Sequence, residues 1–121
     1  MKTPLYKAAS DGSIELVKNL LASGADPNKG LRNTHKGGSV MVKTPLYVAA
    51  NYGNTEVVRS LLESKADPNE GERYTDKDGK KTMIRKNPLY AAAAGGHTKM
   101  VRILLASGAR QDLDTGGGEL V

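Results

Sequence analysis

The chain has 121 residues, a formal net charge of +5 and 38% hydrophobic residues, a size that suits one small domain. Its five aromatic residues are all tyrosines, and it has no cysteine, which excludes disulfides, thiol catalysis and cysteine-ligated zinc. No apolar run approaches the roughly 20 residues that span a bilayer, and no secretory leader follows Met1. We therefore expect a cytoplasmic or nuclear protein that does not enter membranes.

Three stretches of the chain align without gaps and predict a stacked repeat. They begin at Thr3, Thr44 and Asn87, so successive starts lie 41 and 43 residues apart. A period between about 20 and 50 residues is the signature of an array in which each unit buries its apolar face against its neighbours. We expect one domain over residues 1–121, made of repeat 1 (about 3–30), a loop (about 29–43), repeat 2 (about 44–71), a second loop (about 70–86), repeat 3 (about 87–111) and a tail (112–121).

Each unit carries the start and stop signals of two short helices. A Thr or Asn that can cap a helix precedes a proline, whose missing amide would be unpaired in the first turn. A glycine then predicts a turn, and apolar pairs four residues apart predict the buried face of a second helix. Gly24 and Gly108 predict left-handed exits from the second helices, whereas Lys65 stands there in the middle unit and predicts either mild strain or a different helix end. In the first unit these signals are Thr3, Pro4, Gly12, Leu16, Val17, Leu20 and Leu21.

These units resemble the ankyrin repeat across nearly the whole chain. The resemblance rests on Thr-Pro-Leu at the start of two units, the alanine pairs, the Leu-Leu pairs, and Gly-Ala-Asp-Pro-Asn from Gly24. It implies a mainly α solenoid of three helix-turn-helix units whose loops project as hairpins. The chain departs from the family in having Tyr6, Tyr47 and Tyr90 where His is usual, which we interpret as a structural column. Its two intervals also exceed the usual repeat of 33 residues by 8 and 10.

The extra residues predict two extended β-hairpins, which we call finger 1 (about 29–43) and finger 2 (about 70–86). Adjacent fingers can brace each other, although a single hairpin is marginal in water. A turn at Asp78-Gly79 would pair Thr75 with Thr82, Tyr74 with Met83, Arg73 with Ile84 and Glu72 with Arg85. A turn near residues 36–38 would pair Leu31 with Val42, Arg32 with Met41 and Asn33 with Val40. A turn at Gly37-Gly38 is the alternative for this finger.

The fingers hold all of the excess positive charge. Residues 29–43 carry four basic and no acidic side chains, residues 70–86 carry six basic and four acidic ones, and the rest of the chain sums to −1. Because loop closure entropy grows slowly with length, insertion without function is one interpretation. The other is a surface that attracts an acidic protein partner.

The residues favour binding over catalysis. His35 and His97 have no nearby Ser, Asp or Glu that would form a nucleophile, base or metal constellation, so we expect no catalytic residue, metal site or cofactor. His97 is interpreted as a capping or surface residue. The family resemblance implies a non-catalytic protein-protein interaction module. The alternatives are binding of nucleic acid or another polyanion through the fingers, for which base-stacking aromatics are scarce, and an engineered or excised scaffold.

The resemblance implies partner contacts near the ends of the first helices and just before them, and the charge adds the fingers. Tyr52 is the only aromatic residue in its column and predicts an anchor, with a lid over Tyr47 or Tyr90 as the alternative. The candidate residues are Ser10, Asp11, Asn51, Tyr52, Lys43 and Lys86 on the concave face, and Arg32, Lys36, Arg73, Tyr74, Lys77, Lys80 and Lys81 in the fingers.

The two ends of the array are expected to differ. Lys7 and Asp11 replace apolar or aromatic counterparts in the middle unit, which predicts a polar N-terminal face. At the other end, residues 91–94 and Ile103 predict an exposed apolar patch, covered by the 112–121 tail, by further units or by self-association.

Overall fold

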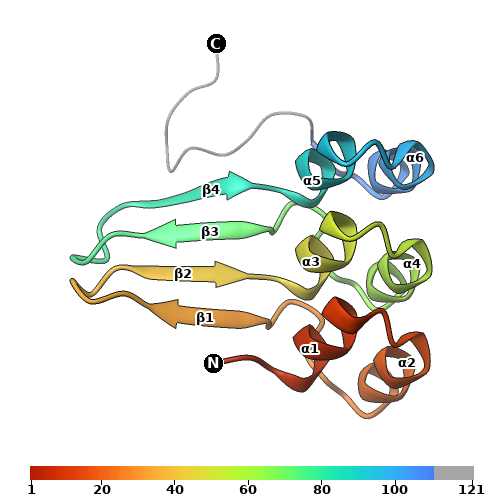
Figure 1. Ribbon diagram of the computed structural model, residues 1–121, viewed down its shortest axis with the longest axis horizontal. Coiled ribbons are helices and arrows are strands. Elements are labelled where there is room, and N and C mark those ends of the chain that lie inside the picture. The colour runs from red at the N-terminus through yellow and green to blue at the C-terminus, as the bar shows by residue number, and fades with distance from the viewer. Residues whose placement is uncertain (111–121) are drawn as a thin grey trace.

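The structure is a computed structural model, and it describes residues 1–110. Six helices in these residues form three units, and four strands project from them to one side (Figure 1). The chain is thus mainly α, with two β-hairpins, as predicted. The elements are α1 (Pro4–Asp11), α2 (Ile14–Ala22), β1 (Leu31–Thr34), β2 (Val40–Lys43), α3 (Pro45–Asn51), α4 (Thr55–Glu63), β3 (Glu72–Thr75), β4 (Thr82–Lys86), α5 (Pro88–Ala94) and α6 (Thr98–Ala106).

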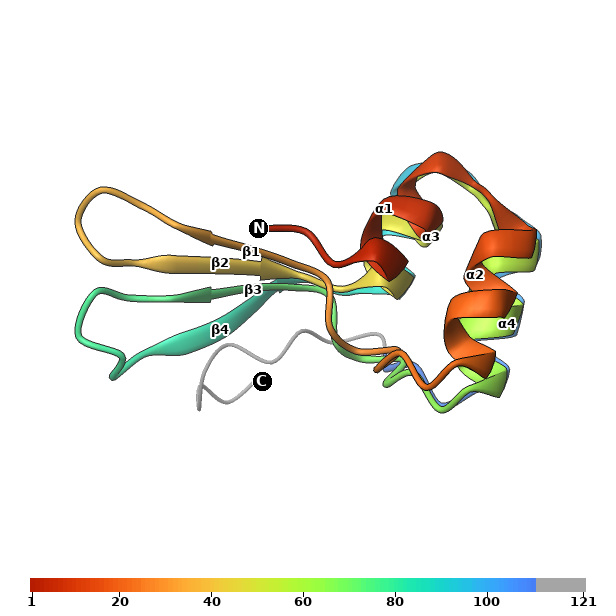
Figure 2. The same ribbon diagram turned by 90° about the horizontal axis from the view of Figure 1, so that it is seen from below.

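The units stack so that first helices contact first helices and second helices contact second helices. Seen along the stack, the two helix layers and the fingers make an L-shaped profile (Figure 2). Small residues permit the close approach of the first helices, since Ala9, Ala50 and Ala92 are fully buried. No helix in residues 1–110 is both long and apolar enough to cross a membrane.

The predicted caps form at all three first helices. The side-chain oxygens of Thr3 and Thr44 each accept a hydrogen bond of 3.1 Å from the backbone N–H three residues later, and Asn87 accepts one of 2.7 Å. Each cap satisfies one of the amides that a helix start leaves unpaired. The threonine hydroxyls also donate to carbonyls 26 residues later, which ties the start of each of these units to its end.

The predicted strain at Lys65 is confirmed. Lys65 has a φ of 73°, in the left-handed region that Gly24 and Gly108 occupy in the flanking units. Its amide donates to Leu62 and the amide of Ala66 donates to Leu61, both at 3.0 Å, so all three second helices end in the same hydrogen-bonded motif. The Cβ of lysine makes this backbone conformation costly.

The two fingers join into one antiparallel sheet in the order β1-β2-β3-β4. Finger 2 has three of its predicted pairs, and the hydroxyls of Thr75 and Thr82 lie 3.1 Å apart as a cross-strand hydrogen bond. The fourth predicted pair is wrong, because a bulge shifts the register and places Lys86, not Arg85, opposite Glu72. The turn also lies one residue earlier than Asp78-Gly79, since the amide of Gly79 donates to the carbonyl of Asp76.

The predicted register of finger 1 is wrong by one residue. Arg32 pairs with Val42 and Asn33 with Met41, and Leu31 lies opposite Lys43. The amide of Gly38 donates to the carbonyl of His35, and the amide of His35 donates to Ser39. The tip therefore has one residue fewer than the tip of finger 2, although a glycine with positive φ ends the turn in both, Gly38 at 96° and Gly79 at 69°.

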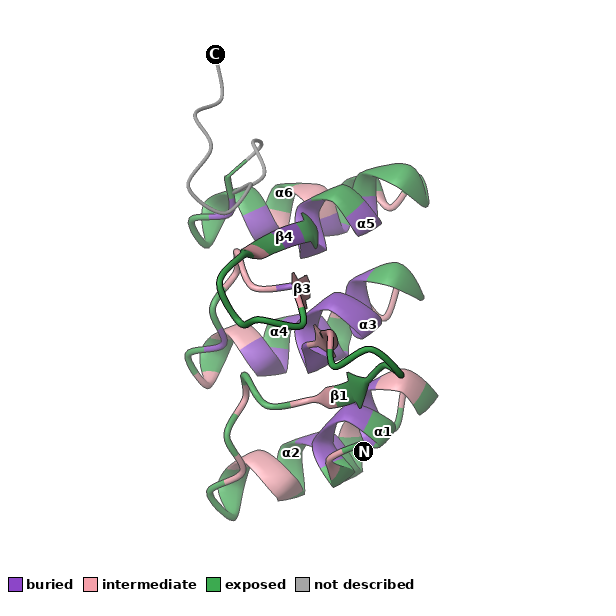
Figure 3. Ribbon diagram, turned by 90° about the vertical axis from the view of Figure 1, so that its left-hand side faces the viewer, coloured by how far each residue is buried: buried purple, intermediate pink, exposed green. Residues whose placement is uncertain are grey.

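The apolar patch predicted at the C-terminal end is only partly correct, since Ala93 and Ala94 are exposed as expected but its other members are not. Ala91 and Ala92 are buried, because α5 packs on α3 through this face, and Ile103 is half-buried against the core. The residues that this end exposes include Tyr90 and Leu105, at 50% and 40% exposure (Figure 3). Residues 112–121, which were predicted to cover this patch, lie outside the described residues.

The N-terminal end is partly polar. The exposed Lys7 and Asp11 lie 3.5 Å apart as an ion pair on α1. The matching positions of the middle unit hold Val48, which is buried, and Tyr52, which is exposed.

Candidate functional site

Four tyrosines gather where the fingers join the first helices. Tyr6 and Tyr47 are only 6% and 7% exposed. Burial raises the pKa of the Tyr6 phenol above 10.0, with Tyr52 and Glu72 adding to the effect. Burial also raises the pKa of Tyr47, followed by the charges of Glu72, Tyr6 and Tyr90. These effects on pKa mean that the phenols and the Glu72 carboxylate lie close enough to influence one another's ionisation.

Tyr52 is the most exposed residue of this group. It lies at the end of α3 with 60% of its surface accessible, and its influence on the Tyr6 phenol places it near that ring. A large ring held at the end of a packed helix loses little side-chain entropy when another surface covers it. Tyr52 therefore has the properties of an anchor for a partner.

The acids at the base of the fingers are paired. Lys43 Nζ lies 3.6 Å from Glu72 Oε2, across β2 and β3. Arg73 Nη2 donates to both carboxylate oxygens of Glu70, at 2.7 Å for Oε2. Neither pair is fully exposed, so both hold the strand bases together more than fully exposed pairs would.

The predicted site residues fall into several locations. Ser10 and Asp11 lie at the end of α1, and Asn51 and Tyr52 at the end of α3. Lys43 and Lys86 both lie opposite Glu72 in one cross-strand row at the finger base. The finger tips hold four more candidates apart from this row, namely Lys36, Lys77, Lys80 and Lys81, all exposed. The remaining three, Arg32, Arg73 and Tyr74, lie in strands β1 and β3.

The sheet separates two of the predicted arginines from Tyr74. Side chains alternate between the faces of a strand, so Arg73 points to the face opposite that of Tyr74. Arg32 lies in the same cross-strand row as Arg73, through Val42. The thirteen candidate residues thus do not share one surface.

Sequence reasoning missed Met41, Met83 and Arg85. Met41 and Met83 flank Tyr74 across the sheet, and the Arg85 guanidinium lies 5.9 Å from the centroid of the Tyr74 ring. The predicted pairing of Tyr74 with Met83 was a signal for one of them. The position of Met41 beside Tyr74 could be found only from the pairing of finger 1 with finger 2, which no local sequence pattern specifies.

The two histidines lie far apart in the fold, His35 in the tip of finger 1 and His97 at the start of α6. No group of three His, Cys, Asp or Glu residues that could hold a metal ion is found in residues 1–110. His97 stands at the cap position of α6, but its side chain makes no capping hydrogen bond. Its ring instead packs on two glycines, since a Cβ at Gly53 or Gly95 would lie 2.6 or 2.5 Å from it.

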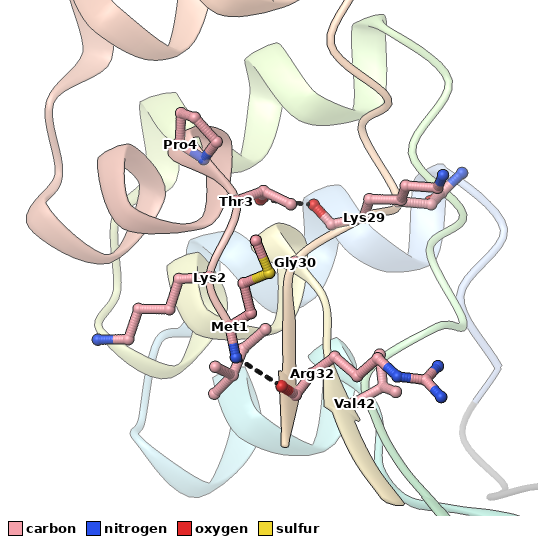
Figure 4. Close-up of a pocket in the computed structure, with 10 residues that line it drawn as sticks. Met1, Lys2, Thr3, Pro4, Lys29, Gly30, Arg32 and Val42 are labelled. Carbon is pink, nitrogen blue, oxygen red and sulfur yellow. Dashed lines mark hydrogen bonds between the residues drawn. The ribbon is translucent and has the colours of Figure 1, made fainter. Parts of the chain in front are cut away.

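Two clefts lie at the ends of the stack. One, of about 510 Å³, is bounded by the first residues of the chain and the start of β1. There the amino group of Met1 donates to the carbonyl of Arg32 at 2.7 Å, and the amide of Arg32 donates back to Met1 (Figure 4). The other, of about 300 Å³, is an apolar hollow at the C-terminal end, lined by Leu89, Tyr90, Ala93, Val101 and Leu105.

Comparison with known families agrees with this architecture. A family model described as ankyrin repeats in three copies matches residues 1–72. A second model, described as ankyrin repeats in many copies, matches residues 46–105. No curated protein matches the chain.

Proposed function

The chain belongs to the ankyrin-repeat family, and on this premise we propose that it is a non-catalytic module that binds a protein partner through its concave face and its basic fingers. Ankyrin repeats are generally protein-protein interaction modules, and the family is generally non-enzymatic. The absence of cysteine suits a reducing compartment. The proposal therefore includes a cytoplasmic or nuclear location.

One observation carries the proposal: the exposed Tyr52 ring stands at the end of the packed helix α3 and raises the pKa of the Tyr6 phenol, as Glu72 at the finger base also does. Aromatic anchors surrounded by polar contacts dominate the affinity of many interfaces. Positive potential on the projecting fingers would accelerate the approach of an acidic partner. The concave candidates Ser10, Asp11, Asn51, Lys43 and Lys86 would supply the polar surroundings.

The test is affinity capture with the whole chain, followed by direct binding of the purified partner. Tyr52→Ala should weaken that binding by at least roughly tenfold, as loss of a hot spot does. Leu16→Ala is the matched control, because Leu16 is 49% exposed but lies in the outer helix layer. Equal binding by the Tyr52→Ala and Leu16→Ala variants would remove the anchor from the proposal.

The finger charges have a separate kinetic signature. Lys80→Glu combined with Lys81→Glu should slow association with an acidic partner, as added salt should, while the dissociation rate changes less. Nucleic-acid binding is the competing function. It requires duplex or single-stranded DNA to bind at about 50 mM salt with a steep salt dependence, and a failure to bind there would exclude it.

We also propose self-association through the C-terminal unit. In every unit the residues that face the next one are Tyr, Ala, Val and Leu, and in the last unit they line the hollow of 300 Å³. A second copy would cover the same apolar surface that the units cover for each other. Sedimentation should show a mass that rises with concentration, and Leu105→Lys should abolish that rise. A monomer at all concentrations would reject this proposal.

A further inference from the structure

One cross-strand row of the finger sheet is apolar at its centre. Met41 lies opposite Tyr74, and Tyr74 lies opposite Met83, so three neighbouring strands place these side chains side by side. Asn33 of β1 ends the row on the other side. Residues directly opposite each other on neighbouring strands share one face of the sheet. The row is therefore continuous across both fingers.

This row remains accessible. Met83 is 39% exposed, and Met41 and Tyr74 are half-buried. By contrast, the row on the other face contains Ile84, which is 6% exposed. The two faces of the sheet thus differ, and the Met-Tyr-Met row belongs to the face that carries Glu72.

Cations border the row, and two of the four acids of finger 2 are already in ion pairs. Arg85 lies over the Tyr74 ring, and the bulge after Arg85 places Lys86 beside Glu72. Glu72 and Glu70 have cationic partners, and Asp76 Oδ1 accepts two backbone hydrogen bonds in the turn. Within residues 1–110 the ion pairs do not include Lys80, Lys81, Arg85 or Lys86. The uncompensated charge beside the row is positive.

We propose that this face seats an acidic, amphipathic segment of the partner protein, a refinement that rests on the proposed function. Apolar side chains of the segment would pack on Met41, Tyr74 and Met83, and its carboxylates would face Arg85 and Lys86. Methionine has flexible, polarisable side chains that adapt to apolar partners of different shape. The charge of the fingers selects an acidic segment over a basic one. A nucleic acid would satisfy the cations but would leave the methionines without an apolar partner.

Three short fluorescein-labelled peptides separate the two components of this recognition. One alternates Leu with Glu, the second alternates Ser with Glu, and the third alternates Leu with Lys. Fluorescence anisotropy with the whole chain should show the Leu-Glu peptide binding at least roughly tenfold more tightly than either of the others. Equal binding of the Leu-Glu and Ser-Glu peptides would overturn the proposal, since the charge alone would then account for affinity.

Variants locate the site on the chain. Met41→Ser combined with Met83→Ser should lower Leu-Glu binding to the level of the Ser-Glu peptide. The single variant Met83→Ser, at an exposed position, should show a smaller loss in the same direction, and circular dichroism checks that both variants are folded. Leu16→Ser is the matched control, because Leu16 is 49% exposed and lies on α2, away from the fingers. If a folded double variant bound as the unmodified chain does, the site would not be this row.

The outcome also separates this inference from the proposed function. A captured partner that loses affinity with Tyr52→Ala, but binds the folded Met41→Ser, Met83→Ser variant normally, would uphold the binding module and reject the Met-Tyr-Met seat. A partner that loses affinity with both sets of changes would support both.

Discussion

Asn28 Oδ1 accepts a hydrogen bond of 2.7 Å from the backbone N–H of Asp67, which lies 39 residues later in the next unit. Asn69 repeats this contact one unit further, where its Oδ1 accepts from the amide of Arg110 at 2.7 Å. Asn69 also donates from Nδ2 to the carbonyl of Gly108 at 3.3 Å. Side-chain amides thus link the loops of successive units, in addition to the packing of their helices.

These links predict a graded loss of stability. Asn69→Ala should lower the free energy of unfolding by about 2 kcal/mol and Asn28→Ala by about 1 kcal/mol, because a typical intramolecular hydrogen bond contributes about 1 kcal/mol. Urea denaturation measures both, with Asn33→Ala on the exposed part of β1 as the control. Losses no larger than the control's would mean that the amides do not couple the units.

Lys65 offers a stabilising change. Lys65→Gly should raise the free energy of unfolding by about 1 kcal/mol, because it removes the penalty of a Cβ at a φ of 73°. Gly24→Lys is the reciprocal experiment. A Cβ at Gly24 would meet no atom within 4 Å, so its expected loss of about 1 kcal/mol reflects backbone conformation alone. Unchanged denaturation midpoints in both variants would contradict this explanation.

The helical part of the fold was predictable because its signals are local. The side-chain caps at the starts of the first helices and the left-handed exit at position 65 both follow from the alignment of the three units. The register of finger 1 was not predictable, since residues 36–38 allow more than one turn and each turn shifts the strand pairing by one residue. The bulge before Lys86 has no local signal at all.

The candidate site was harder to predict because it depends on contacts between units. Lys43, Glu72 and Lys86 are recognisable as charges, but their common row follows from the pairing of β2 with β3, across about 30 residues of chain. The C-terminal patch was placed on residues 91–94 and Ile103 because a repeat pattern identifies apolar columns without showing which neighbour buries each one. The structure assigns Ala91 to the face against α3.

Finger 2 should be ordered in solution. Asp76 Oδ1 accepts from the amides of Asp78 and Lys80, at 3.2 and 3.1 Å, which stabilises the turn. Hydrogen exchange should therefore be slowed at Thr75 and Thr82, and Asp76→Ala should accelerate exchange in finger 2 while leaving α3 unchanged. Exchange of residues 72–86 at the rate of a free peptide in the unmodified chain would show that the finger is not formed.

The buried phenols predict sensitivity to alkali. Burial is the first cause of the raised pKa of Tyr6 and of Tyr47. Since the folded-state pKa lies above the unfolded value, the folded protein retains more protons at alkaline pH. The stability that this contributes is complete below about pH 10 and is lost as the pH rises through the folded-state pKa values. The free energy of unfolding should therefore fall above about pH 10.

Phenylalanine substitutions test this assignment. Tyr6→Phe combined with Tyr47→Phe should lose less stability than the unmodified chain between about pH 9 and about pH 11. Glu72→Gln should reduce the loss in part, because the carboxylate is a smaller cause of both shifts than burial. Equal losses in the unmodified chain and the double phenylalanine variant would assign the alkaline sensitivity to other groups.

Equivalent valines in the stack should respond differently to the same substitution. Val58 is fully buried between the second and third units, whereas Val101 is half-buried at the C-terminal face and borders the hollow there. Val58→Thr should lower the free energy of unfolding by about 1–3 kcal/mol, since it buries a hydroxyl without a hydrogen-bond partner. Val101→Thr should cost less than half as much, because water reaches this face.

Val17→Thr, at the fully buried position between the first and second units, should match Val58→Thr. Urea denaturation of the three variants at low protein concentration provides the comparison, and a loss at Val101 as large as that at Val58 would show that another part of the protein covers the C-terminal face in solution.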